Sequence, residues 1–597
     1  MTRRILTLGL SILAASTLAA PAAQAHAQLQ GTSPARGAVL RTQPNEVVFR
    51  FGESVEGNFG AVRVFDARGQ RVDDGKVVHP GGHGSQVAVG LRPHLKRGTY
   101  TATYRVISAD SHPVSGGVVF SIGKAGTGPA ETVADLLAGS STGAVTQIAF
   151  GVTRGLDYLA IALAVGGLGF VLVAWGPALA GAAGAGGGWP EASAIFARRA
   201  RRLVGLAVAL GIVAGAAGIA LQGATAAGTS FWAALDVSVV REVLDTRFGA
   251  VWGLRVVAWV LLGAVLLAGA GTRAVTVLRP AAVGAAGVAP APAPRAGVLA
   301  ALALPAAFLL VSPALAGHAT TLHPVVALLP LDAVHVTAMS LWIGGLAMLL
   351  FVLPGATRRL EASERTRLLA AVLVRFSPLA LACVIALAAT GVTQPLIDMG
   401  GLSPVLDTAF GRAVLIKFGL LTALVALGAI NRQRVVPALR RLAAGGESPG
   451  AAGRLLRRTL RAEVALVVVV LGVTSALVSY APPKSAASAP VSVTKRMGPI
   501  ELQTTVDPAR AGANQLHVYL FDARSGTPYA RTKELTVQAS LPAKGIGPLP
   551  ATMSRAGPGH YVANALLLLP AGDWTLTLTD RVSDFDEYTT TVKVRVR

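Results

Sequence analysis

The sequence predicts a multi-domain membrane protein in which an all-β domain, a bundle of eight transmembrane helices and a second all-β domain follow one another. Three observations predict this order: an export signal at the start, repeated apolar runs of membrane-spanning length, and strand-like alternation in the segments on either side. We expect a signal peptide over 1–25, a β-sandwich over 26–124, a linker over 125–145, the membrane domain over 146–480, a linker over 481–490 and a second β-sandwich over 491–597.

The first 25 residues have the three regions of a secretory signal peptide. Arg3 and Arg4 supply positive charge, Ile5 to Ala20 are apolar, and Ala23-Gln24-Ala25 is a cleavage site of small residues. Cleavage there leaves His26 as the first residue of the mature chain. Its α-amine and imidazole can then close a chelate ring on a metal ion, and such nitrogen donors suit Cu(II). The alternative is that His26 is an ordinary residue of a frayed terminus.

The segment after the signal has the composition of a β-domain. The runs 46–51, 62–65 and 99–104 are rich in β-branched and aromatic residues, and turn-forming residues lie close to their ends. Further on, Asp110 and His112 are two residues apart and would face the same way on an extended segment. This pair is a weak signal alone, but together with the amine and ring of His26 it would complete a coordination square.

Two stretches of this domain resemble the CopC family of periplasmic copper-binding proteins. They are 26–29 with 33–38, and 98–116, so that the resemblance covers about residues 26–124. It implies a small β-sandwich of the cupredoxin or immunoglobulin type. It also implies a Cu(II) site made by the N-terminal amine, His26, Asp110 and His112. The domain contains no methionine, so we do not expect the Met-rich Cu(I) site that some relatives carry.

Eight apolar runs follow, and a hydrocarbon core of about 30 Å needs about 20 apolar residues per helix. The expected spans are 146–175, 203–222, 248–270, 296–316, 326–353, 376–396, 409–430 and 462–480.

Arginine is concentrated in alternate loops, which is the positive-inside pattern of membrane proteins. The pattern places both ends of the membrane domain outside the cytoplasm, as a secreted first domain requires. It also accounts for most of the net charge of +23, so we expect the lipid bilayer as a partner and no nucleic acid. The arginine-rich loops carry Arg198, Arg199, Arg201 and Arg202; Arg273, Arg279 and Arg295; Arg358, Arg359, Arg365 and Arg367; and Arg432, Arg434, Arg440, Arg441, Arg454, Arg457 and Arg458.

Two short echoes indicate internal repetition. The run 243–249 at the start of the third span resembles 405–411 at the start of the seventh. Gly166-Gly167-Leu168 in the first span resembles Gly344-Gly345-Leu346 in the fifth. Spans 1–4 and 5–8 are therefore predicted to be parallel repeats, an arrangement found among transporters.

Five candidate ligands cluster around the fourth and fifth spans: His318, His323, Asp332, His335 and Met339. Spacings of three and four place the last three on one helical face. Ionisable residues at membrane depth are costly and mark a pathway or a buried partner. Imidazole suits either copper oxidation state and thioether favours Cu(I), so we expect a copper path that enters from outside. Hydrogen bonding that merely joins helices stays open as the alternative.

The same cluster resembles the CopD family. The resemblance rests on 317–319, 332–335, Ala338, 342–346, 375–377, 390–392, Phe410-Gly411, Lys417 and Asn431-Arg432, and it covers most of 146–480. It implies an inner-membrane protein linked to copper uptake. Fusion to a CopC-like domain would raise the effective concentration of one site near the other.

The last segment alternates like a second small β-sandwich, for example over 516–520 and 574–579. It resembles the YtkA-like family through 559–561 and 572–574. His517, Met553 and His560 are candidate copper ligands there, but no close ligand spacing supports them, and a solvent-facing or packing role is the favoured interpretation. The single cysteine, Cys383, excludes an intrachain disulfide and is expected to pack within the sixth span.

No phosphate loop, nucleotide fingerprint or nucleophile elbow is present, and we expect no enzyme activity. The favoured hypothesis is a copper transport protein of the plasma (inner) membrane, with both terminal domains on the extracytoplasmic side and an external copper chaperone as a partner. It would capture Cu(II) outside and pass copper inward, in an oxidation state left open between Cu(I) and Cu(II). The alternatives are a copper- or haem-dependent membrane redox protein and a copper sensor without transport.

Overall fold

The computed structural model describes residues 29–35, 38–57, 61–108, 113–123, 143–183, 188–271, 283–284, 287–288, 296–320, 325–399, 404–477, 491–524, 528–557 and 559–596. The predicted ligands His26, Asp110, His112 and His323 lie outside these residues. The N-terminal β-domain, the helical region and the C-terminal β-domain are described separately below.

The N-terminal domain consists of two sheets around one apolar core. Alternation produces this core, because Val47, Phe49 and Phe51 are buried while Glu46 and Arg50 are exposed. The Phe49 ring lies 5.0 Å from the ring of Tyr104, which belongs to the other sheet. One sheet has the order β1 (Leu29–Ser33), β3 (Glu46–Phe51), β7 (Gln86–Leu91), β6 (Asp73–Val78); the other has β2 (Val39–Leu40), β9 (Pro113–Ile122), β8 (Gly98–Ser108), β4 (Val55–Glu56), with β5 (Val62–Phe65) also paired to β8.

The C-terminal domain also has two sheets and one core, as its alternation predicts. Trp574 is fully buried at the centre, and its Nε1–H donates a hydrogen bond to the Pro570 carbonyl oxygen, 2.9 Å away. One sheet has the order β12 (Val491–Met497), β13 (Ile500–Asp507), β14 (Gly512–Asp522), β18 (His560–Leu568), β17 (Ser554–Gly557); the other has β16 (Ile546–Ala551), β15 (Glu534–Leu541), β19 (Gly572–Arg581), β20 (Glu587–Val596).

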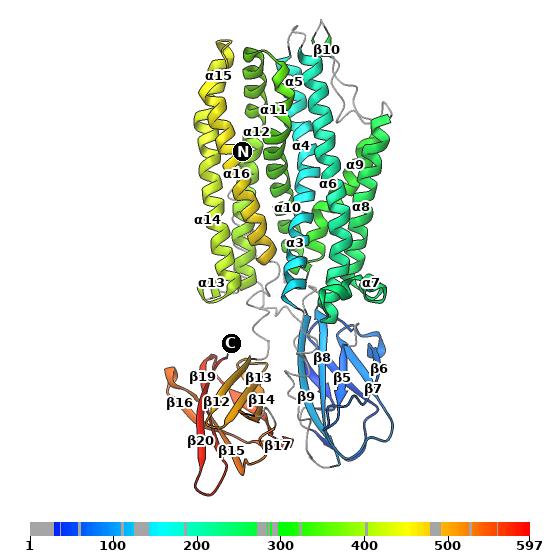
Figure 1. The fold of residues 1–597 in the computed structure, drawn as a ribbon, viewed down its shortest axis with the longest axis vertical. Coiled ribbons are helices and arrows are strands. Elements are labelled where there is room, and N and C mark those ends of the chain that lie inside the picture. Colours follow the sequence, from blue (N-terminus) through cyan, green and yellow to red (C-terminus); the bar gives the residue numbers. More distant parts are fainter. Residues whose placement is uncertain are drawn as a thin grey trace. The chain divides into compact units, whose positions relative to one another are not determined.

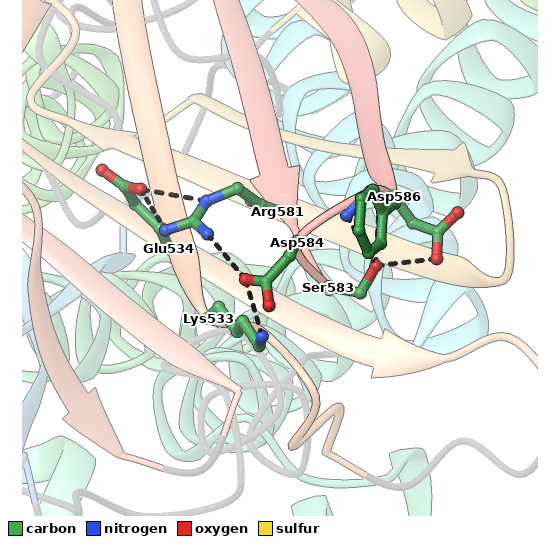
Figure 2. A network of polar contacts seen from close by, with 7 residues as sticks. Lys533, Glu534, Arg581, Ser583, Asp584 and Asp586 are labelled. Atoms are coloured by element: carbon green, nitrogen blue, oxygen red, sulfur yellow. Dashed lines mark hydrogen bonds and ion pairs between the residues drawn. The ribbon is translucent and has the colours of Figure 1, made fainter.

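Charged side chains join β15 to the turn between β19 and β20, as Figure 2 shows. Arg581 forms ion pairs with Glu534, at 2.8 Å, and with Asp584, at 3.6 Å, while Lys533 reaches Asp584 at 2.9 Å. Ser583 donates a hydrogen bond to Asp586. All these ion-pairing side chains are largely exposed, so each pair contributes only about 0–1 kcal/mol and serves mainly to fix the turn.

The helical region contains, in the part of the chain described, seven helices long and apolar enough to cross a membrane. A shorter apolar helix, Ala300–Leu315, lies within the predicted fourth span. Figure 1 shows the helices running side by side, and the chain is a multi-pass membrane protein. The main helices of this region are α3 to α5 (Ala144–Ala182), α6 (Gly188–Ala227), α8 (Arg247–Gly271), α9 (Ala296–Leu315), α10 (Val325–Ala347) continued to Arg359, α12 (Ala362–Met399), α14 (Ala409–Ile430) continued through α15 (Val436–Ala444), and α16 (Gly450–Leu477).

The first sequence echo has the same structural role in both places. Thr246 Oγ1 accepts a hydrogen bond from the Gly249 N–H at 3.1 Å, and Thr408 Oγ1 accepts one from the Gly411 N–H at 3.0 Å. Each threonine thus caps the start of its helix. A short helix precedes each cap, α7 (Val237–Leu244) before the first and α13 (Pro404–Asp407) before the second. This equivalence supports two repeats.

The second echo marks the place where the repeats touch. A Cβ atom on Gly166 would overlap the Ser340 carbonyl oxygen, and one on Gly344 would overlap the Ala162 carbonyl oxygen and the Gly166 backbone. Helix backbones can approach this closely only where side chains are absent. The two equivalent glycines therefore form the crossing of the first and fifth spans.

We expect Gly344→Ala to destabilise the bundle by about 1–3 kcal/mol, the usual result of overfilling a packed interior. Thermal unfolding of the detergent-purified protein measures this as a lower midpoint. Gly419→Ala in α14 is the matched control, since its Cβ would meet nothing within 4 Å. Equal midpoints for both variants would show that the close crossing is not required.

Candidate metal centre

Three of the predicted ligands surround one cavity, here called the histidine cavity. Asp332, His335 and Met339 of α10 all line this space of about 280 Å³ and are partly exposed to it. Gln394 of α12 and Lys417 of α14 line it too. The common helical face predicted from the spacing of α10 is thus the face that borders the cavity.

His335 presents one ring nitrogen to this cavity as a lone-pair donor. Its Nδ1 lies 2.7 Å from the Thr390 hydroxyl. That hydroxyl has one proton, and the Ala386 carbonyl accepts it at 2.7 Å. We therefore assign the His335 hydrogen to Nδ1, where it donates to Thr390. Nε2 is then unprotonated and able to bind a metal, the arrangement found where a second group orients a histidine ligand.

Asp332 lies between a neutral and a cationic partner. Gln394 Nε2–H donates to its Oδ1 at 3.3 Å, and the Lys417 ammonium interacts with it electrostatically. Sequence reasoning did not assign Thr390, Gln394 or Lys417 to the site. The sequence did indicate Lys417, because a lysine inside an apolar span is as unusual as an aspartate such as Asp332.

The remaining membrane candidates are only partly visible. The backbone of His318 belongs to a short turn, His318–Thr320, that follows α9, and its side chain is outside the described atoms. Its neighbours Gly317 and Ala319 line the histidine cavity. The turn therefore lies at the border of the cavity.

The equivalent position in the first repeat holds an ion pair. Asp157 lies nine residues before Gly166, as His335 does before Gly344, and Arg255 lies six residues after Gly249, as Lys417 does after Gly411. Arg255 Nη1 and Asp157 Oδ2 are 2.8 Å apart and fully buried. Arg255 Nε–H also donates to Ser312 Oγ at 2.9 Å. In the first repeat the two side chains therefore contact each other, whereas in the second repeat His335 and Lys417 line a cavity.

Within the described ranges, no three His, Cys, Asp or Glu side chains gather closely enough to hold a metal ion. The histidine cavity offers one imidazole nitrogen, one carboxylate and one thioether. These donors fit copper, with the imidazole suited to either oxidation state and the thioether favouring Cu(I).

In the N-terminal domain, strand register shows where the start of β1 and the end of β8 lie, the two strand ends next to the predicted ligands in sequence. Leu29, where β1 begins, pairs with Phe51, and Val55, four residues later in the chain, pairs with Ser108 at the end of β8. The start of β1 and the end of β8 therefore lie at the same end of the domain.

The C-terminal histidines face one another instead of a ligand. His517 Nδ1 and His560 Nε2 are 3.2 Å apart, and both rings are buried. At this separation one ring can donate a hydrogen bond to the other. Met553 packs against the domain core. The burial of both histidines agrees with a packing role and not with a solvent-facing one.

Comparisons with known families agree with this division of the chain. Residues 29–123 match the CopC domain, 145–291 match the copper resistance protein D-like N-terminal domain, and 370–477 match copper resistance protein D. The chain contains a CopC domain and a CopD domain. The CopD match includes Gln394 and Lys417, which line the histidine cavity, and Thr390, which contacts His335.

The chain is also similar to individual proteins. Copper transport protein CutJ of Bacillus subtilis (strain 168) is 27% identical over 578 residues, which are 94% of each chain. Protein YobA of Escherichia coli (strain K12) is 31% identical over 121 residues, 20% of this chain and 97% of that protein. The crystal structure of CopC from Methylosinus trichosporium OB3b is 26% identical and covers 18% of this chain and 98% of that one, with a TM-score of 0.15.

We expect Asp157→Ala alone, or Arg255→Met alone, to lower the free energy of unfolding of the CopD region by about 3–5 kcal/mol, because each leaves one buried charge uncompensated. The double variant Asp157→Leu with Arg255→Met removes both charges and should recover most of the loss. Thermal unfolding in detergent tests this. A double variant less stable than either single variant would contradict it.

The buried histidine pair predicts how acid affects the C-terminal domain. Burial and the neighbouring His517 ring hold the pKa of His560 well below its usual value, about 6.5 in unfolded chains. The unfolded state therefore binds more protons, and this contribution to stability falls as pH drops below about 6.5. Burial raises the pKa of Asp580 to about 6, which acts in the opposite direction between pH 6 and 4.

Comparison with His560→Phe removes the histidine contribution and leaves that of Asp580 unchanged. Hydrogen exchange of the β14 and β18 amides in the full chain, at pH 7 and pH 5, gives the two slopes. We expect the wild-type protein to lose more protection between these values than the variant. A larger loss in the variant would contradict the assignment.

Proposed function

We propose that this chain is a copper transport protein that captures Cu(II) in its CopC domain and passes copper across the membrane through the second repeat of its helices. The observation that carries the proposal is the histidine cavity, where His335 Nε2, the Met339 thioether and the Asp332 carboxylate lie on one face of α10. Copper transport is also the function named for CutJ, which the chain resembles over 94% of its length.

The capture site consists, in this proposal, of the N-terminal amine, His26, Asp110 and His112. The strand register supports it, because the chain enters β1 at the end of the domain where β8 finishes. His26 lies three positions before Leu29, and Asp110 lies two positions after Ser108. Both sets of donors are therefore attached to the same end of the CopC domain.

In the membrane, copper would move from the extracytoplasmic side through His318 and, within the second repeat, through His335, with Asp332, Met339 and His323 as further contacts. The arginine-rich loops support cytoplasmic placement of the opposite end. Before copper arrives, Lys417 would balance the charge of Asp332, so that a cation entering the cavity competes with the ammonium group.

The finer features of the chain follow the same proposal. We propose removal of residues 1–25, linkers over 125–145 and 481–490, eight spans, β-sandwich folds for both terminal domains, a YtkA-like C-terminal domain, an external copper chaperone and no enzymatic step. Support comes from the α9 helix in the fourth span and from the two-sheet topology of both β-domains.

Copper accumulation in cells at low external copper tests the function. We compare wild type with His335→Ala and His112→Ala at matched expression levels. The control is His94→Ala, which changes an exposed histidine. We expect wild type and the control to raise copper behind the membrane and His335→Ala to abolish the gain. His112→Ala should lose the gain at low copper and regain it at high copper, because capture limits uptake only when copper is scarce.

Lower internal copper with the wild-type chain would mean export. If none of the variants changes copper content, the transport proposal fails, and a Soret band or oxygen-dependent turnover of the purified protein would then favour a redox role.

A further inference from the structure

We propose that the copper path continues from the histidine cavity past a constriction formed by Trp342 and Leu424 into a second cavity, where the Glu463 carboxylate is the next binding site for the ion. This inference rests on the proposed transport function. It adds a site and a barrier to that function.

The second cavity, here called the glutamate cavity, has a volume of about 310 Å³ and is lined by Glu463, Asn431 and Arg432 among others. Trp342 of α10 and Leu424 of α14 line both this cavity and the histidine cavity. Their side chains are 5% and 2% exposed. These two apolar side chains therefore form the wall between the cavities, and a rotamer change of either would connect the two spaces.

Glu463 is a carboxylate held in place without a cationic partner. It is 2% exposed in the middle of α16. Asn431 Nδ2–H donates to its Oε1 at 2.8 Å, and Thr459 Oγ1–H donates to Asn431 Oδ1 at 2.6 Å. No lysine or arginine in the described ranges forms an ion pair with it, and the Arg432 guanidinium donates to Ser377 Oγ instead. An unpaired buried carboxyl group is costly to ionise, so a cation that enters the cavity can take the place of its proton.

The helix that carries Asn431 is locally widened at this point. Residues Asn431–Val435 form a π-helical turn between α14 and α15, and turns of this kind are frequent at functional sites. As a result, the consecutive residues Asn431, Arg432 and Gln433 all line the glutamate cavity. A regular α-helix would turn successive side chains about its axis and could not direct all three to one space so easily.

The two cavities differ in ligand chemistry, and the difference suits passage. The histidine cavity contains an imidazole and a thioether, whereas the glutamate cavity has no His, Met or Cys among its lining residues. Oxygen donors hold copper, and Cu(I) especially, less tightly than nitrogen and sulfur donors. An ion that crosses the constriction is thus attracted by charge but weakly retained, as transport requires.

Full-length protein in proteoliposomes with trapped bathocuproine disulfonate, supplied with Cu(I) kept reduced by ascorbate, tests the path. The variants are Glu463→Gln, which keeps an acceptor for Asn431, and Leu424→Trp, which fills the constriction. Their controls are Glu447→Gln, in an exposed loop, and Leu415→Trp, on an exposed position of the same helix α14. Copper bound per chain at equilibrium is measured beside the transport rate, with His335→Ala as reference.

We expect Glu463→Gln and Leu424→Trp to slow transport by roughly tenfold or more, because one removes the charge and the other blocks the passage. Both variants should still bind at equilibrium the copper that His335→Ala fails to bind, because the first site is unchanged. Both controls should match wild type. If both variants transport like wild type while His335→Ala does not, the path through Glu463 is wrong and the proposed function stands. If wild type itself moves no copper, the proposed function fails and this inference fails with it.

Should Leu424→Trp not purify as a folded protein, Glu463→Gln decides alone. It is nearly isosteric and keeps the hydrogen bond from Asn431. Normal copper binding with a wild-type transport rate in this variant overturns the proposal.

Discussion

Polar side chains among membrane helices must find their hydrogen-bond and charge partners within the protein, because hydrocarbon offers none. The ion pair between Asp157 and Arg255 meets this requirement for the two charges, with Ser312 accepting a further hydrogen bond from the guanidinium. It joins α3, α8 and α9 at a point where neither charge meets solvent. The first repeat is thereby fixed in one arrangement, against which the second repeat is packed through the Gly166–Gly344 crossing.

The second repeat meets the same requirement differently, and this difference creates a site. Where the first repeat has aspartate and arginine in contact, the second has His335 and Lys417 on the border of a cavity. Histidine carries no negative charge in either protonation state, so it cannot pair with the lysine as Asp157 pairs with Arg255. The first repeat thus holds a buried ion pair, whereas the equivalent position of the second repeat borders a cavity with room for a cation.

Sequence reasoning located α10's polar face because a spacing of three and four is a local property of one helix. It also located the strands and the apolar spans, whose periodicity is local as well. It missed Thr390, Lys417, Trp342, Leu424 and Glu463 as parts of one pathway, because periodicity does not say which helices are neighbours. The glycine echo carried more information than a repeat alone, since equivalent residues of the two halves proved to be each other's contact. The capture ligands His26, Asp110 and His112 remain predictions supported by strand register.

The donors named along the chain change in a consistent order. The proposed capture site has nitrogen donors and a carboxylate suited to Cu(II), the histidine cavity adds a thioether that favours Cu(I), and the glutamate cavity has oxygen donors alone. An ion bound most tightly at the last site would stay there. Placing the weakest donors beyond the Trp342–Leu424 wall means that attraction between Glu463 and the ion draws copper through, while poor ligation lets it leave. In this proposal the order of the donors eases passage in either direction, and the copper gradient across the membrane sets the net direction.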